Sequence, residues 1–397
     1  MKHTTWSAAI AAAMLTAACG GGGSGGTGAS TGTLSVSLTD NPCDYRAVFV
    51  TVDRLRVHAS GDAAESDAGW RDVPLALSPA QRRVNLLELQ NGVSLKLGDL
   101  DLAAGRYTQL RLVLADNGAG TPANEVVFAD GSRAPLTTPS AQRSGVKLIR
   151  PFDVAPGQIV ELMLDFDACR SVVRAGNSGN WLLKPTVAVI PLLDVGRIAG
   201  VATAGALVSA QATAPGQAPV VVKSTQVAVD GSFALSPLPA TAAGTTYTVV
   251  VGAPNAATAV VRSVPVVRQQ TTVLSTSAAP IPATASPASA LTGLALPAGL
   301  DGTSVRALQT VDGVEVEVAG TVPDALTGGY LLRVPRAAAR VATFPATPST
   351  PLSFAPAAGA PATYVVEASA AGRGAVRSAP VDAAAADRIV PDLTIAP

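Results

Sequence analysis

Three cysteines carry most of the chemistry that this sequence offers, and the first of them is the most informative. Cys19 closes the run Leu15-Thr16-Ala17-Ala18-Cys19, which follows Lys2 and the apolar residues 8–15. An apolar segment this short cannot span a bilayer, and a positive start followed by small residues is typical of an export signal. We therefore expect residues 1–18 to be a signal peptide that is removed from the mature chain.

The run that ends at Cys19 resembles the lipobox of bacterial lipoproteins, with Thr16 where that motif most often has Leu. The resemblance implies that the Cys19 thiol receives diacylglycerol and becomes the new N-terminus, so that acyl chains anchor the protein to a membrane. Gly20 follows, rather than Asp, which by resemblance to Gram-negative lipoprotein sorting implies the outer membrane. The alternative is an ordinary secretory signal cut after Ala18, which would leave an exported chain with an odd number of cysteines.

The other two cysteines, Cys43 and Cys169, lie in what we expect to be one folded unit. They could form a disulfide, remain as buried thiols or bind a metal. Export into an oxidising compartment favours the disulfide, which would connect the start of a sheet to a later strand. A metal site lacks partners, because His58 is the only histidine after the predicted leader.

The shortage of histidine also limits catalysis. A serine–histidine–aspartate triad would have to use His58, which precedes Ala59-Ser60-Gly61, a sequence typical of a solvent-exposed loop. Ser144 and Lys147 match the Ser-x-x-Lys spacing of penicillin-binding proteins, but Gly145 and the alternation after it predict a loop that enters a strand. We therefore expect no catalytic residues, and we interpret the chain as non-enzymatic.

Several carboxylates fall close to the predicted disulfide. Glu161, Asp165 and Asp167 share one face of a strand-like run, and Asp40 and Asp44 flank the first of the two cysteines. Oxygen-rich clusters suit Ca²⁺, which makes Asp40, Asp165 and Asp167 weak metal candidates, and paired carboxylates can also serve a glycosidase. Since no Asp-x-Asp-x-Asp-Gly loop is present, we favour a solvated strand face over a metal site and expect no cofactor.

Charge and composition exclude a nucleic-acid partner and favour a β-rich body. Basic and acidic side chains number 28 each, and charged residues make up 14% of the chain. Because no basic run interleaved with aromatic residues is present, nucleic-acid binding has no electrostatic basis. Small and β-branched residues punctuated by Gly and Pro are typical of many short strands and turns. Aromatic residues make up only 4%, which leaves few stacking platforms for sugars.

Alternating apolar residues predict the strands that must position these groups. Buried faces with a period of two run through residues 33–39, 48–57, 108–114 and 160–166, a pattern that favours an antiparallel sandwich. Within 48–57 the apolar parity changes at Asp53-Arg54, which predicts a β-bulge or bend. Residues 79–89 form the one helix-like segment, and it is short.

Shifts in composition divide the chain, and we expect an all-β fold of tandem antiparallel β-sandwiches. The Gly-rich residues 19–32 have nothing to bury and predict a flexible tether. Residues 33–195 form the first unit, 196–278 the second, 279–290 a Pro/Ala/Ser linker and 291–397 the third. Asp230-Gly231 predicts a turn in the second unit. Both later units resemble the transthyretin-like or carboxypeptidase-regulatory type of sandwich, which is immunoglobulin-like in architecture.

Several short sequence blocks of the first unit are distinctive, and their positions are 38–40, 45–52, 86–93, 104–112, 138–140, 144–148 and 164–168. In this order the blocks resemble a bacterial lipoprotein module, the family of the domain of unknown function 4382. The resemblance implies a lipid-anchored, extracytoplasmic β domain of unestablished activity.

Together these features favour a non-enzymatic lipoprotein that is anchored in the outer membrane and faces the periplasm or the cell surface. It would act as a binding or structural module of the envelope, with the membrane as one partner through the lipid. A further partner would be an envelope protein or polysaccharide, recruited by loops at the ends of the sandwiches. A carbohydrate-binding or adhesive surface protein is the alternative, and a hydrolase is the third and least favoured class.

Overall fold

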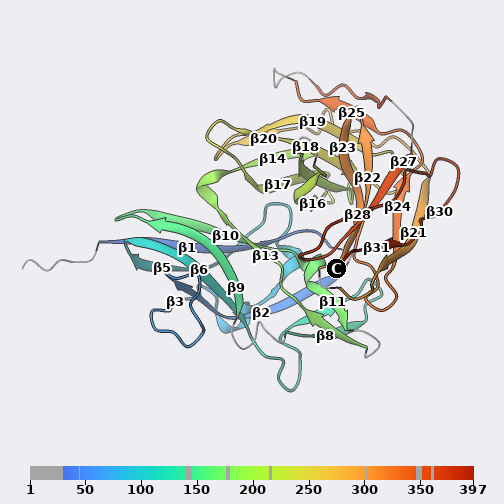
Figure 1. Cartoon of the computed structure of the whole chain (residues 1–397). Helices are drawn as coiled ribbons and strands as arrows, with labels where there is room; N and C mark the ends of the chain where they lie inside the picture. Colours follow the sequence, from blue (N-terminus) through green and yellow to red (C-terminus); the bar gives the residue numbers. More distant parts are fainter. Residues whose placement is uncertain are drawn as a thin grey trace, which may run out of the picture.

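The computed structural model describes residues 30–43, 45–138, 145–175, 179–213, 217–300, 302–345, 351–358 and 362–397, and most of them lie in β-strands or turns (Figure 1). The strands form several mixed, mostly antiparallel sheets, which confirms the prediction of an all-β fold of tandem sandwiches. Helical turns in this part of the chain are short, and α1 spans only Ala168–Ser171. None of the described helices is long and apolar enough to cross a membrane.

The first unit packs two sheets around one apolar core. Its strands are β1 (Thr31–Asp40), β2 (Ala47–His58), β3 (Arg71–Val73), β4 (Arg83–Asn85), β5 (Leu95–Ala103), β6 (Gly105–Leu114), β7 (Glu125–Val127), β8 (Arg133–Thr137), β9 (Val146–Val154), β10 (Ile159–Phe166), β11 (Val172–Ala175), β12 (Asn180–Leu183) and β13 (Val187–Pro191). One sheet has the order β13-β10-β1-β5, and the other has the order β11-β12-β8-β7-β2-β6-β9 with β3 and β4 paired to β2. Apolar side chains from both sheets meet in one cluster.

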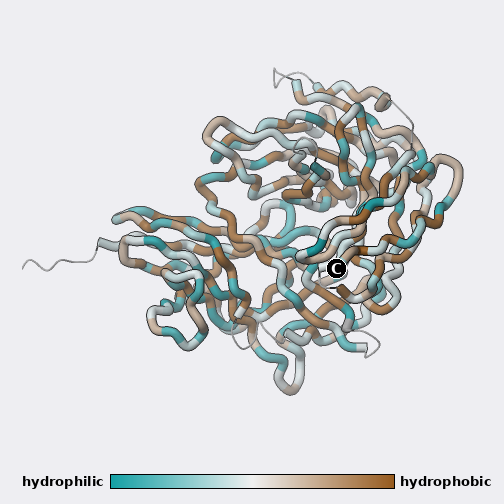
Figure 2. The backbone as a smooth tube through the Cα atoms, in the orientation of Figure 1, coloured by the Kyte–Doolittle hydropathy of each residue, from teal (hydrophilic) through white to brown (hydrophobic). Residues whose placement is uncertain are grey.

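The buried faces of this unit follow the predicted period of two. Leu34, Val36 and Leu38 on β1 are fully buried, and each such side chain contributes about 1.5–3 kcal/mol by leaving water. Figure 2 shows the resulting alternation of hydrophobic and hydrophilic residues along the strands. The pairing of β2 with β6 shifts register between Val52 and Arg54, which confirms the predicted bulge. β1 pairs with β5 antiparallel and with β10 in parallel, so the sheet that they share is mixed.

The helix expected at residues 79–89 is not formed. The segment consists of two 3₁₀ turns, η1 (Pro79–Arg82) and η2 (Leu86–Glu88), separated by strand β4. Val84 pairs with Val50 of β2 and is buried, so the sheet takes up the middle of the segment. Because a helix this short gains little from its own hydrogen bonds, tertiary pairing prevails over it.

The second unit is a smaller sandwich with its own core. Its strands are β14 (Val195–Val201), β15 (Leu207–Ala212), β16 (Val220–Gln226), β17 (Ser232–Pro239), β18 (Thr245–Gly252), β19 (Ala259–Val266) and β20 (Thr271–Val273). The small sheet has the order β17-β14-β20, and the large one runs β16-β15-β18-β19. Between β16 and β17 the chain turns at Asp230-Gly231 as predicted, with Gly231 at a φ of 84°.

The third unit folds around a further core and lends two strands to the second. Its strands are β21 (Ala288–Leu296), β22 (Ser304–Val311), β23 (Val314–Thr321), β24 (Gly329–Pro335), β25 (Arg340–Thr343), β26 (Ala355–Pro356), β27 (Thr363–Ser369), β28 (Val376–Arg377), β29 (Val381–Asp382), β30 (Arg388–Ile389) and β31 (Leu393–Thr394). β25 pairs in parallel with β19, and β26 continues the same sheet (Figure 1). The two later units therefore share one six-stranded sheet.

Candidate functional site

The structure joins Cys43 to Cys169 in a disulfide, as predicted. Their Cα atoms lie 5.2 Å apart, although 126 positions separate them in the sequence. The bridge ties the loop after β1 to the short helix α1 after β10. It therefore holds the ends of two neighbouring parallel strands together. Cys19 lies outside the described residues, and so does Asp44 of the predicted acidic group.

The acidic face of β10 is solvated only at its start, where Glu161 is exposed, whereas Asp165 is buried, which corrects the expectation for that residue. This side chain is only 6% exposed, and its Oδ1 accepts a hydrogen bond of 2.6 Å from Nζ of Lys223 on β16 of the second unit. The lysine is itself 1% exposed, and its Nζ also donates to the backbone oxygen of Asp40 at 3.2 Å. The second unit covers this face and supplies the counter-charge, which the pattern of β10 alone does not reveal.

The neighbouring carboxyls of Asp40 and Asp167 are also engaged by the protein. The Ala168 amide donates to Oδ1 of Asp40 at 2.9 Å, while Oδ2 is buried without a partner in the described structure. Burial raises the pKa of the Asp40 carboxyl well above its ordinary value. Asp167 caps α1 by accepting from the Arg170 amide at 3.0 Å, and burial raises the pKa of its carboxyl.

Within this cluster the carboxylate of Asp165 holds the ammonium group of Lys223. Burial raises the pKa of Asp165, and the positive charge of Lys223 partly offsets that effect. Among the described residues, His, Cys, Asp and Glu form no group of three or more that could hold a metal. The sequence analysis did not identify Lys223. The feature that could have pointed to it is a single charged residue directly after the valine run 220–222.

His58 is the last residue of β2, directly before the exposed residues Ala59 and Ser60, and its side chain holds the loop that follows. Its Nδ1 accepts from the Ser60 amide at 2.9 Å, and its Nε2 lies 3.0 Å from the Ala68 carbonyl oxygen. The ring packs on Trp70 with centroids 5.0 Å apart. Both ring nitrogens therefore serve the local backbone. Ser144 lies outside the described residues.

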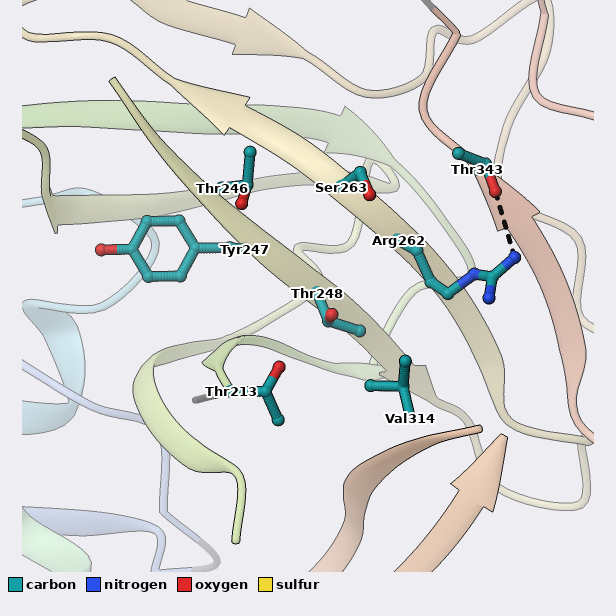
Figure 3. Close-up of a pocket in the computed structure, with 8 residues that line it drawn as sticks. All are labelled: Thr213, Thr246, Tyr247, Thr248, Arg262, Ser263, Val314 and Thr343. Atoms are coloured by element: carbon teal, nitrogen blue, oxygen red, sulfur yellow. Dashed lines mark hydrogen bonds between the residues drawn. The ribbon is translucent and has the colours of Figure 1, made fainter. Parts of the chain in front are cut away.

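A pocket of about 450 Å³ lies where the second and third units meet (Figure 3). Its lining is rich in hydroxyls and consists of Thr213, Thr246, Tyr247, Thr248, Arg262, Ser263, Val314 and Thr343. β18 and β19 supply the floor, while β23 and β25 of the third unit add Val314 and Thr343. Tyr247 contributes no exposed ring, because its side chain is buried and its hydroxyl donates to the Pro239 oxygen.

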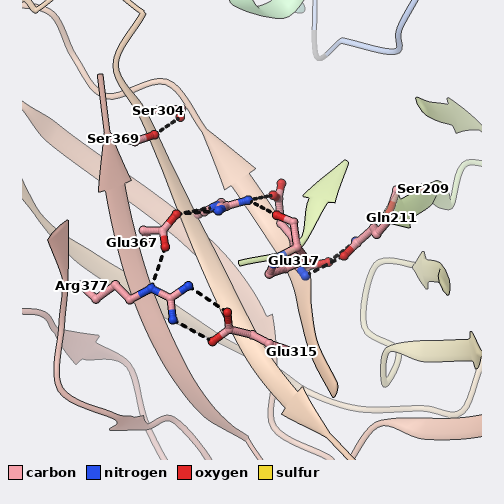
Figure 4. A network of polar contacts seen from close by, with 10 residues as sticks. Ser209, Gln211, Ser304, Glu315, Glu317, Glu367, Ser369 and Arg377 are labelled. Carbon is pink, nitrogen blue, oxygen red and sulfur yellow. Dashed lines mark hydrogen bonds and ion pairs between the residues drawn. The ribbon is translucent and has the colours of Figure 1, made fainter. Parts of the chain in front are cut away.

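An arginine–glutamate network also connects the second and third units (Figure 4). Arg306 donates to Glu367 at 2.6 and 2.8 Å, to Glu317 at 3.2 Å and to the Pro219 oxygen of the second unit. The side chain of Gln211 on β15 makes two hydrogen bonds to the backbone of Glu317, at 2.7 and 2.9 Å. These contacts set how β23 lies against the second unit.

Comparison with known proteins identifies only the first unit. Residues 31–185 match the family model described as "Domain of unknown function (DUF4382)". No curated protein matches the sequence. The solved structure of a leucine-rich repeat protein from Bacteroides thetaiotaomicron aligns over 64% of this chain and 27% of its own, at 12% identity and a TM-score of 0.16. An overlap this loose carries no argument about the fold. Residues 31–185 of this chain are a DUF4382 domain.

Proposed function

We propose that the protein is a non-enzymatic lipoprotein of the outer membrane, anchored through Cys19 and acting as a binding or structural module of the envelope. The observation that carries the proposal is the junction of the first two units, where Lys223 is buried against Asp165. A buried pair of this kind favours one orientation of the units, because other arrangements strip a buried charge of its partner. Units held in one orientation suit a protein that presents one defined surface to a partner, while the predicted tether at 19–32 leaves that surface free to move relative to the anchor.

The junction of the second and third units supports the same function. β25 extends the sheet of the second unit, so main-chain hydrogen bonds cross between the units. A separate apolar cluster lies at this junction, with Val250 and Val260 of the second unit against Val311, Val316 and Val341 of the third. On their sequence resemblance we assign the later two units to the transthyretin-like class of sandwich, which serves here as spacer and interaction module.

The positions of the groups that could do chemistry also support a non-enzymatic role. The ring nitrogens of His58 are both occupied by backbone groups, so the imidazole has no free position for proton transfer to a substrate. Asp165 is buried beneath the second unit and held by Lys223, so it cannot reach a substrate as the acid or nucleophile of a glycosidase.

The anchor is tested by replacing Cys19 in cells that are fed an alkyne-labelled fatty acid. We expect the wild-type protein to carry the label and to sediment with outer membranes, whereas Cys19→Ser carries no label. Ser24→Ala, which changes the adjacent tether and no thiol, should keep both properties. Mass spectrometry that finds an unmodified thiol at the mature N-terminus of the wild type would overturn the proposal.

A carbohydrate-binding role is the second candidate, and the hydroxyl-lined pocket beside Arg262 favours it. In either case the partner is captured by polar contacts at a junction and not by aromatic stacking. Crosslinking in intact cells, followed by identification of the attached protein or glycan, separates the two candidates. Recovery of neither a protein nor a glycan would contradict both.

A further inference from the structure

The pocket at the second junction is built from both later units, so it exists only when they are docked. Thr246 and Thr248 project from β18, and Arg262 and Ser263 come from β19. Thr343 closes one side from β25 of the third unit. Small-ligand sites occur preferentially at such domain junctions, in cavities of roughly 300–1,000 Å³, and this pocket of about 450 Å³ is of that size.

A β-bulge forms the centre of this pocket. Tyr247 pairs with Val264 and Val249 pairs with Val261, so Arg262 and Ser263 together oppose the single residue Thr248. Ser263 adopts a φ of 57°, in the left-handed region that non-glycine residues rarely occupy. Bulges re-aim side chains and are frequent beside functional sites, and strained backbone gathers there as well. Here the bulge brings the side chain of Arg262 and the hydroxyls of Ser263 and Thr248 to one part of the pocket.

Arg262 is the cation of this pocket, and its contacts within the protein are long. Its Nη2 lies 3.3 Å from Oγ1 of Thr343 and 3.9 Å from the carboxylate Oδ2 of Asp312. Its Nη1 donates to the backbone oxygen of Asp312 at 3.5 Å. Its Nε is buried and has no partner among the described residues. Asp312 already accepts from the Ala358 amide at 2.8 Å.

Other junction arginines show what a satisfied guanidinium looks like in this protein. Arg306 and Arg377 contact Glu367 at 2.6–2.8 Å, as is usual for charge-assisted hydrogen bonds. Arg262 has no contact of that length in the described structure, although 30% of its side chain is open to solvent. It therefore retains the capacity to take a bidentate carboxylate from outside the protein.

The hydroxyls around Arg262 narrow the class of ligand. Within the described residues, the side chains of Thr246, Thr248 and Ser263 make no hydrogen bond of their own, so each can donate to or accept from a ligand hydroxyl. We propose that this pocket binds an acidic sugar, a uronic acid residue of an envelope polysaccharide, with its carboxylate on Arg262 and its ring hydroxyls on these side chains. The inference rests on the proposed role as an envelope binding module and names its ligand class.

The test is calorimetry on the complete mature protein with three probes: a galacturonate trimer, the neutral galactose trimer and inorganic phosphate. We expect the acidic trimer to bind at least tenfold more tightly than the neutral one, because only the former places a carboxylate on the guanidinium. Phosphate should not displace the acidic trimer at equal concentration. Equal affinity for the two trimers, no binding of the acidic trimer, or displacement by phosphate would each overturn the inference.

Three variants locate the site. Arg262→Gln should weaken binding of the acidic trimer at least tenfold. Ser263→Gly removes a hydroxyl while suiting the positive φ, so it should keep or raise the melting temperature and still weaken binding a few-fold. Arg268→Gln changes an exposed arginine of the same unit that pairs with Asp194, and it should bind as the wild type does. If Ser263→Gly and Arg262→Gln each bind the acidic trimer as tightly as the wild type, the ligand binds elsewhere and the assignment is refuted.

The length of the trimer recovered after incubation with the protein distinguishes failure of this inference from failure of the proposed function. Shortened oligomers would contradict the non-enzymatic function and leave the binding site standing. Intact oligomers with no heat of binding would contradict the site alone.

Discussion

Lys223→Met removes the cation from the junction of the first two units, and the resulting loss of stability can be worked out from the structure. The substitution leaves the carboxylate of Asp165, which is 6% exposed, buried without its partner. Loss of one member of a buried pair costs about 3–5 kcal/mol. The cost has an upper limit, because the buried carboxylate of Asp165 can take up a proton instead of staying charged. Protonation costs about 1.4 kcal/mol for each pH unit above the ordinary pKa of about 3.9, so the limit is about 4 kcal/mol at pH 7. We therefore expect a loss of 3–4 kcal/mol at neutral pH that shrinks steadily on acidification.

The assay is urea unfolding of the mature chain at pH 7 and pH 5, followed by tryptophan fluorescence. Trp70 and Trp181 both lie in the first unit, so the signal reports the side of the junction that carries Asp165. Lys96→Met is the matched control, because Lys96 makes an exposed ion pair with Asp99 and its removal should cost less than about 1 kcal/mol.

A double variant gives the sharpest version of this test. Lys223→Met combined with Asp165→Leu removes both charges, so most of the lost stability should return. The reasoning is refuted if the single variant costs less than 1 kcal/mol at pH 7, if its cost is the same at both pH values, or if the double variant is no more stable than the single one.

Four other variants test the disulfide, a buried carboxyl and the second junction. Replacing Cys43 and Cys169 together by Ser should lower the free energy of unfolding by about 4–5 kcal/mol, because the bridge joins residues 126 positions apart. Wild-type protein whose melting temperature is unchanged by reductant would contradict this. Because burial raises the pKa of Asp40 well above its ordinary value, the folded state loses stability as the pH rises above the unfolded pKa of about 3.9. Asp40→Asn should therefore stabilise the protein at pH 7 and less so near pH 4 in urea unfolding, and a gain that grows on acidification would be inconsistent with a raised pKa. Arg306→Met should cost about 2 kcal/mol in a thermal melt, and Arg377→Met, whose side chain is 40% exposed, should cost less. Equal costs for the two variants would show that burial at the junction does not matter.

The local features of the first unit were predictable because burial in a strand repeats every two residues. Leu34 and its neighbours on β1 alternate in sequence and in burial alike, and the parity change near Asp53 marks the register shift of β2. The disulfide followed from compartment and cysteine number, which need no knowledge of the fold. The helix predicted at 79–89 was wrong, because pairing of β4 with β2 is a tertiary contact that local helix propensity does not contain.

The contacts between units were not predictable from local pattern. Asp165 has the spacing of an exposed residue on β10, and its burial depends on Lys223, 58 positions later. The bulge at Arg262 and Ser263 likewise interrupts an otherwise regular valine-rich strand, and nothing in the local sequence announces a left-handed residue there. A lone lysine after a valine run and a lone arginine inside one are, in retrospect, the signals of these two junction sites.

At the junctions between units, apolar contacts hold the units together and polar contacts set their orientation. At the second junction, the valines around Val250 remove apolar surface from water, a force with no preferred direction. The paired hydrogen bonds between Gln211 and Glu317 supply the direction, because a shift of one residue would break both. At the first junction, Lys223 and Asp165 have the same orienting role, and their net contribution to stability is small once desolvation is counted. A chain with only 14% charged residues has therefore placed several of them between its units, where they determine how the units are oriented relative to one another.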